Sequence, residues 1–198
     1  MRGADGASGI VRLEKSLAQV VAQAGHGKYY EAAVNGRMFW AANTAAQAIS
    51  VALTTTYTGL CVSNPANSGV NLVPVSVLQA SSVDIAALCT IHLIGGFSAA
   101  GIVTHTAALI AQSTLLDNEG RLAKAKADSQ ATIVNPKYLL ALRAASDIAA
   151  DVAEFKSGQS LSDLDGMFVV PPGGWVAVGA LTATTGFCSM VWEEIPIV

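Results

Sequence analysis

Residues 56–78 read TYTGLCVSNPANSGVNLVPVSVL, and this stretch decides the fold. Apolar and β-branched residues fill its two arms, Tyr57–Val62 and Val70–Leu78, and such residues suit a pleated, half-buried surface. The SNPANSG segment at 63–69 separates the arms with residues that are typical of turns. The stretch therefore predicts two strands joined by a short loop.

The same pattern of apolar runs bounded by turn residues continues along the chain. It predicts further strands at 49–56, 85–94, 102–111, 167–170, 175–182 and 186–196, with a corner at Gly95–Gly96 and a turn at Pro171–Gly174. Many short strands with Gly and Pro turns favour a sandwich or a barrel.

The last predicted strand has a clear two-residue period. One face would carry Phe187, Ser189, Val191 and Glu193, and the other Cys188, Met190, Trp192 and Glu194. Because Glu193 and Glu194 would face opposite sides, they cannot form an acid/base pair.

Asn35–Gly36 lies between aromatic and apolar residues, from Tyr29 to Trp40. Asn-Gly supplies the two positive φ angles of a type I′ turn, so this segment predicts a β-hairpin.

Charged residues are concentrated in separate blocks of the sequence. Between Arg37 and Asp117 the only charged residue is Asp84, although a typical soluble domain has about a quarter charged residues. The window 85–116 is long enough to span a bilayer but lacks flanking basic anchors. We therefore favour burial against protein, with a small membrane protein using 85–116 as an alternative.

The charge blocks suggest the domain organisation. We expect an N-terminal arm with a short helix at 1–27, where Val11, Leu17 and Val20 lie near helical spacing, and a β-sandwich domain at 28–198. Within that domain, 117–165 is predicted as a charged, loop-rich insertion. Its segment 138–156 could be a helix or a strand.

Few residues suggest chemistry. Cys89 and His92 supply two of the four ligands that a zinc site needs. His92 and His105 lie in apolar runs, which favours hydrogen-bonded buried or interface histidines over a general base. Asp163 and Asp165 offer too few oxygens for a calcium site. We therefore expect no catalytic residue, no cofactor and no bound metal.

Composition limits the partners. Cys61, Cys89 and Cys188 have apolar neighbours and are predicted to be buried, reduced thiols. The 11 basic residues are scattered and the net charge is −3, so we expect no nucleic-acid partner.

Two parts of the chain resemble a group of tailed-bacteriophage virion proteins with a jelly-roll domain. In those proteins an N-P-x-x-S-G-x-N-L loop joins two core strands, and a P-G-G turn precedes a strand that ends in W-x-E-x-P. The matching positions here are Asn64, Pro65, Ser68, Gly69, Asn71 and Leu72, then Pro172, Gly173 and Gly174, then Trp192, Glu194 and Pro196. The resemblance implies a multimeric capsid-decoration, head-spike or connector part, and a strand at Tyr138–Arg143.

We therefore predict a mainly β protein, an antiparallel β-sandwich of jelly-roll type with an N-terminal arm and one or two short helices. Its function would be that of a non-catalytic structural virion component that stabilises or decorates a phage capsid or spike, assembled in the bacterial host cytoplasm. The expected partners are further copies of the chain, with a trimer favoured, and the major capsid protein or neighbouring virion proteins.

Two alternatives stay open besides the membrane protein. A receptor-binding fibre head would bind carbohydrate through Tyr29, Tyr30, Phe39, Trp40 and Tyr57, and an enzyme of unrecognised type would gather the histidines, Cys89 or the acidic groups. The residues that we expect to matter for folding or interfaces are Asn35, Gly36, Trp40, Asn64, Pro65, Pro172, Gly173, Gly174 and Trp192.

Overall fold

The structure is a computed structural model that describes residues 11–13, 17–19, 27–82, 89–99, 104–116, 122–145 and 159–197. The chain divides into two compact units, Met1–Glu31 and Ala32–Val198. In the first unit, β1 (Val11–Leu13) and β2 (Leu17–Gln19) pair antiparallel. The helix predicted from the spacing of Val11 and Leu17 is therefore wrong at these residues, and Val20 lies outside the described ones. A lone short helix has little stability in water without packing.

The remaining elements form mainly β structure. Their bounds are α1 (Tyr30–Val34), β3 (Met38–Ala42), β4 (Gln47–Ile49), β5 (Thr56–Ser63), β6 (Val70–Ser81), β7 (Cys89–Phe97), β8 (Thr104–Leu109), β9 (Gln112–Ser113), β10 (Lys126–Thr132), β11 (Lys137–Ala145), β12 (Gln159–Asp163), β13 (Gly174–Ala180) and β14 (Thr184–Pro196).

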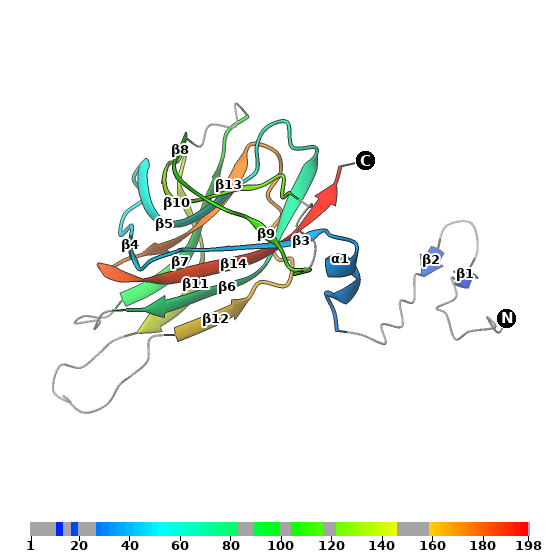
Figure 1. The fold of residues 1–198 in the computed structure, drawn as a ribbon, viewed down its shortest axis with the longest axis horizontal. Helices are drawn as coiled ribbons and strands as arrows, with labels where there is room; N and C mark the ends of the chain where they lie inside the picture. The colour runs from blue at the N-terminus through cyan, green and yellow to red at the C-terminus, as the bar shows by residue number, and fades with distance from the viewer. Residues whose placement is uncertain are drawn as a thin grey trace. The chain divides into compact units, whose positions relative to one another are not determined.

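Two antiparallel sheets pack face to face (Figure 1). We call them the β14 sheet, with order β12-β6-β14-β3-β9, and the β13 sheet, with order β11-β7-β13-β5-β10-β8. Without β4 and β8–β10, eight strands remain, four in each sheet, as β12-β6-β14-β3 and β11-β7-β13-β5. The chain crosses between the sheets as a jelly roll does, so the predicted fold is confirmed.

Three strands extend this jelly roll between β7 and β11. β10 and β8 are added to the β13 sheet next to β5, and β9 is added to the β14 sheet next to β3. The prediction of 117–165 as an insertion is wrong, because that range includes β10 and the jelly-roll strands β11 and β12. Tyr138–Arg143 lies within β11, as the resemblance implied. Leu139 and Leu142 have helical spacing, but pairing of β11 with β7 prevails over local propensity there.

Most predicted strands are confirmed, as β5, β6, β7, β8, β13 and β14. Two differ. β4 ends at Ile49 and β5 begins only at Thr56, so 49–56 is not one strand. At 167–170, Val170 alone forms a bridge, to Leu72, because the Pro171 that follows has no N–H to continue a ladder.

Asn35–Gly36 does not form the predicted hairpin. Gly36 has a φ of 65° and ends α1: its N–H donates to Ala33 O (2.8 Å), and the Arg37 N–H donates to Ala32 O (2.9 Å). These two bonds define a Schellman motif, the usual glycine-containing end of a helix. Asn-Gly fits both kinds of turn, so the dipeptide alone could not distinguish them.

The central core lies between the two sheets. β14 directs Cys188, Met190 and Trp192 into it, and Phe39 of β3 stacks on Trp192 with ring centroids 6.4 Å apart. The predicted alternation of β14 is confirmed, because these side chains are buried while Phe187 and Ser189 on the other face are not.

A second apolar cluster covers the outer face of the β13 sheet. It contains Tyr57, Cys61, Ile94, Ala131, Ile133, Trp175 and Ala177. Residues 133–136 connect β10 to β11 and cross this face, since β10 and β11 lie on opposite sides of β5, β13 and β7. Trp175 Nε1 donates to Val134 O of the crossing segment (2.9 Å). β13 is therefore buried on both faces, and every one of its residues is buried.

The crossing explains Gly95–Gly96, which lies inside β7 and not at the predicted corner. A Cβ on Gly96 would lie 2.6 Å from Val134 O and 2.7 Å from Asn135 O. Glycine within a strand often marks such a close approach of another backbone.

Gly96→Ala should therefore destabilise the fold, by about 1–3 kcal/mol, as overpacking typically does. Chemical unfolding measures the change. Gly27→Ala is the control, because nothing lies within 4 Å of its added Cβ, and it should change stability by less than about 0.5 kcal/mol. Equal stability of the Gly96 variant and wild type would show that the segment 133–136 does not cross there.

Candidate interaction surface

The two motifs of the virion-protein resemblance meet at one end of the sandwich. The Asn64 N–H donates to Gly174 O, and the Gly173 N–H donates to Asn64 O, both at 2.8 Å. The buried side chain of Asn64 adds bonds from Nδ2 to Val70 O (2.8 Å) and to Val170 O (2.9 Å). Asn64 therefore ties the loop between β5 and β6 to the turn before β13.

The predicted turn residues shape this junction. Pro65 O accepts from the Ser68 N–H (3.0 Å), and Pro171 O accepts from the Gly174 N–H (2.8 Å). Pro172 and Gly173 are the central residues of the second turn, and the φ of 88° at Gly173 fits position i+2 of a type II turn. The roles of these residues are structural.

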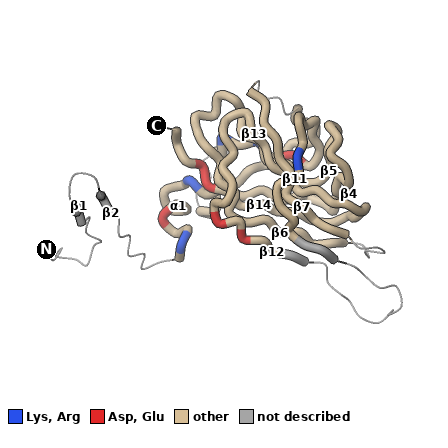
Figure 2. The backbone as a smooth tube through the Cα atoms, turned by 180° about the vertical axis from the view of Figure 1, so that it is seen from behind, with Lys and Arg blue, Asp and Glu red and all other residues tan. Residues whose placement is uncertain are grey.

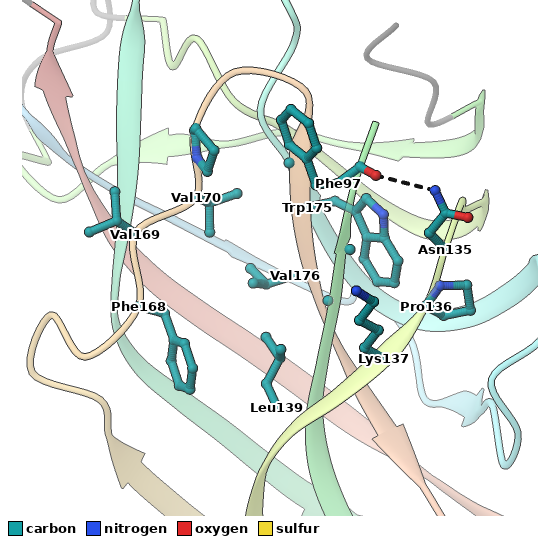
Figure 3. A pocket seen from close by; sticks show the side chains of 14 residues that line it. Phe97, Asn135, Pro136, Lys137, Leu139, Phe168, Val169, Val170, Trp175 and Val176 are labelled. Atoms are coloured by element: carbon teal, nitrogen blue, oxygen red, sulfur yellow. Dashed lines mark hydrogen bonds between the residues drawn. The ribbon is translucent and has the colours of Figure 1, made fainter. Parts of the chain in front are cut away.

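A shallow cavity of about 640 Å³ lies beside the junction (Figure 3). Phe168 and Leu139 line one part of it, with Val176 near its centre, while Asn135 and Lys137 lie on the other side. Lys137 is the one charged group among the lining residues, and Asn135 Nδ2 already donates to Phe97 O (3.4 Å). The cavity thus lacks the converging polar groups that orient a specific ligand.

The structure does not gather the candidate catalytic residues. Cys89 faces the central core, whereas His92 lies beside Tyr138, with ring centroids 5.1 Å apart. His105 is on β8, and three strands of the β13 sheet, β13, β5 and β10, lie between β8 and β7. Asp163 Oδ1 accepts from the Asp165 N–H (3.0 Å) in the turn after β12. No group of three or more His, Cys, Asp or Glu side chains suited to a metal occurs among the described residues.

All three cysteines are buried outside disulfides, as predicted. Burial raises the pKa of the Cys188 thiol to about 12 and raises the pKa of Cys61 further. Neither thiol is a thiolate at neutral pH, and the thiolate is the reactive form.

Two of the five aromatic residues of the carbohydrate hypothesis are buried in different clusters. Phe39 is buried in the central core and Tyr57 in the second cluster. The Tyr57 hydroxyl donates to Val178 O (2.6 Å), which fixes the ring inside the protein. These two rings are therefore inaccessible to a sugar.

Two buried carboxylates have partners that the sequence did not reveal. Glu194 Oε1 accepts from the backbone N–H groups of Lys124 and Ala125, each at 2.9 Å, and from Trp192 Nε1 at 3.4 Å. This carboxylate fastens the segment before β10 to β14. The alternation along β14 indicated that Glu194 shares a face with Trp192, but no local pattern names its partners.

Asp128 on β10 is fully buried, and its Oδ2 contacts His105 Nδ1 on the neighbouring strand β8. Its Oδ1 has no hydrogen-bond partner. Burial raises the pKa of the Asp128 carboxyl, and the hydrogen bond and charge of His105 act in the opposite direction. His105 is hydrogen-bonded, as predicted, but it is exposed and not buried in the chain. The sequence did not reveal that β8 and β10 are neighbours.

The outward surface of the β14 sheet differs from all these buried groups. Cross-strand partners place its side chains in rows: Leu161, Leu78, Ser189 and Ala42 in one, Ala80 and Phe187 in another, and Ser76, Val191 and Trp40 in a third. We call these nine residues the outer β14 face.

The outer β14 face is apolar and accessible. Leu161 is 68% exposed and Phe187 is 44% exposed, and Trp40 is partly exposed. None of the nine residues is charged. The nearest charges are Asp163, opposite Ser76 at the sheet edge, and Glu193, which pairs with Arg37 (3.2 Å). Figure 2 shows the charges of the sandwich gathered mainly at one end, with most of its strands uncharged.

The membrane alternative has no helical support in the part of the chain that the structure describes. There the window 85–116 forms β7, β8 and β9. No helix in the described ranges has the length and apolarity of a membrane crossing.

Glu194→Gln should reduce stability by about 1.5–3 kcal/mol, the range for hydrogen bonds to a charged group. The amide nitrogen of the substituted side chain is a donor, and it would also face a backbone N–H, which cannot accept its hydrogen bond. Glu193→Gln is a control at the adjacent position, and loss of its ion pair should cost less than about 1 kcal/mol. Urea unfolding of both variants compares them, and equal losses would contradict the role assigned to Glu194.

Asp128 should make stability depend on pH. Its raised pKa means that the folded protein keeps this proton to higher pH than the unfolded chain, whose value lies near 3.8. The resulting contribution to stability is present below that value and is lost as pH rises through the folded pKa. Unfolding midpoints of wild type, measured relative to Asp128→Asn, should fall across this window. Parallel pH curves would contradict the assignment.

Comparisons with known proteins do not add to these observations. No family model, curated protein or solved structure matches the chain. The likeness to virion proteins therefore stays a prediction from the loop and strand motifs. The function has to be argued from the surfaces of the molecule.

Proposed function

We propose that this chain is a structural virion component that associates with copies of itself to stabilise or decorate a phage capsid or spike. The outer β14 face is the observation that carries the proposal. An antiparallel sheet with one open face normally places polar residues on that face. Here Leu161, Phe187 and Val191 occupy such positions.

The two sheets differ in what covers their uncharged outer surfaces. On the β13 sheet, the protein's own segment 133–136 and the Trp175 cluster cover the central part of the outer surface. The outer β14 face has no such cover among the described residues. An exposed apolar patch of this kind is typical of an interaction site, and burying it contributes about 25 cal/mol per Å².

The virion role is supported by the motifs of the resemblance. Asn64 and Gly173 belong to different motifs and are bonded to one another. The two motifs thus behave as one structural unit in a jelly roll. From the resemblance we favour a trimer, which would contact the major capsid protein or neighbouring virion proteins.

Light scattering coupled to size-exclusion chromatography tests self-association. Wild type should have at least three times the 20.2 kDa mass of the chain, without detergent. Leu161→Glu combined with Phe187→Glu should lower the mass, because charges on the face would have to be desolvated. Leu181→Glu is the control, since Leu181 is 52% exposed but lies outside the face.

A folded wild-type monomer would contradict the proposal, as would unchanged assembly of the double variant. Circular dichroism should show the same fold in all three proteins. Antibodies against the chain should also label the surface of the source phage particle in electron micrographs, and their failure to label intact or disrupted particles would contradict the virion role.

A further inference from the structure

Strand β8 is attached weakly at the edge of the β13 sheet. Among the described strands it pairs with β10 alone, as Figure 1 shows. Four of its six residues are exposed and none is fully buried. The register between the two strands shifts twice, between Asp128 and Gln130 and between Gln130 and Ala131. Such irregularities interrupt the ladder of backbone hydrogen bonds. Few buried contacts therefore support β8, and local opening is easiest in segments of this kind.

Two side-chain contacts bridge the interrupted stretch. Asp128 Oδ2 contacts Nδ1 of His105, although the backbone of His105 lies opposite Ala131, beyond both shifts. Ser129 Oγ donates to Ala107 O (3.4 Å). The pair of Asp128 and His105 thus joins β10 to β8 where backbone pairing is interrupted.

The position of Asp128 favours a neutral carboxyl group. The side chain is 0% exposed, and within the described residues its Oδ1 has no hydrogen-bond partner. Three titratable groups act on it or face it: His105 on β8, Lys126 on β10 and the buried thiol of Cys61, which lies opposite Asp128 on β5. Burial raises the pKa of the Asp128 carboxyl more than His105 and Lys126 lower it. Burial also raises the pKa of Cys61, so this thiol stays neutral beside the carboxyl.

We propose that the contact between Asp128 and His105 is a proton-dependent latch that holds the β8 edge closed against β10. When β8 separates locally from β10, water reaches the Asp128 carboxyl. A buried carboxyl with an unpartnered oxygen is tolerated better as the neutral acid than as the anion. Loss of the proton therefore favours the open edge.

The direction of the pH effect follows from this difference between the two states. In the open state the hydrated carboxyl has its ordinary pKa, near 3.8, and in the closed state its pKa is higher. The stabilisation of the closed state is complete below pH 3.8 and is lost as pH rises through the pKa of the closed state. Within this window, the opening equilibrium increases by at most about tenfold per pH unit, because one proton is released.

The latch concerns one edge strand and does not depend on the proposed function. It also differs from the effect of Asp128 on global unfolding, because only β8 has to separate. A local opening exposes little surface, so low concentrations of urea should hardly change it, whereas global unfolding responds strongly to urea.

Amide hydrogen exchange of wild type across this pH range tests the latch, after correction for the intrinsic effect of pH on exchange. The protected amides at 104–109 should exchange faster as pH rises and should be insensitive to low urea. Amides at 174–180, in the buried strand β13, should exchange more slowly at every pH and should respond to urea.

Three variants assign the effect to the latch. Asp128→Asn cannot ionise, so exchange at 104–109 should no longer depend on pH. His105→Gln removes the partner that lowers the pKa of Asp128, so the transition should move to higher pH. Asp163→Asn makes the same chemical change on β12 of the other sheet and should behave as wild type does.

Exchange at 104–109 that does not change with pH in wild type would overturn the inference. The same pH dependence in Asp128→Asn as in wild type would also overturn it, as would an unmoved transition in His105→Gln. Equal responses to urea at 104–109 and 174–180 would show that β8 opens only by global unfolding, which would contradict a local latch.

Discussion

The crossing of residues 133–136 over the outer surface of the β13 sheet is the constraint on which the structure depends. The hydrogen bond from Trp175 Nε1 to Val134 O anchors the crossing, and Gly96 leaves room for its backbone. The crossing requires β10 and β11 to lie on opposite sides of three strands. It also gives the β13 sheet a second apolar cluster, so that β13 is buried along its whole length.

This asymmetry changes the meaning of the low charge content. If both outer sheet surfaces were open, uncharged strands would imply a large exposed apolar area on each. Instead, the chain itself covers the central part of one sheet, and the outer β14 face is an uncharged surface that the described residues leave open. The virion role then becomes a proposal about a specific surface.

Much of the sandwich could be predicted from local patterns. β5, β6, β13 and β14 each have strong strand signals bounded by turns, and the burial of Trp192 follows from its place in the alternation of β14. Signals with two physical meanings were harder to resolve. Asn35–Gly36 fits a hairpin turn or a helix end, and Gly95–Gly96 fits a corner or a close backbone approach. In β11, sheet pairing prevailed over helical spacing.

The candidate sites depended even more on long-range structure. Glu194 binds a segment some 70 positions away, and Asp128 meets His105 only because β8 and β10 are neighbours. The outer β14 face becomes visible once the register aligns Leu161 with Leu78 and Val191 with Trp40. No short window of sequence contains that alignment. Likewise, the low charge of 38–116 indicated burial without showing which surface is covered by the protein itself.

Acrylamide quenching of tryptophan fluorescence tests the central claim most directly. Trp175 and Trp192 are buried, whereas Trp40 is partly exposed on the outer β14 face. If copies associate through this face, Trp40 should resist quenching in wild type and become accessible in the variant with Glu at 161 and 187. Equal quenching of Trp40 in both proteins would contradict association through the outer β14 face.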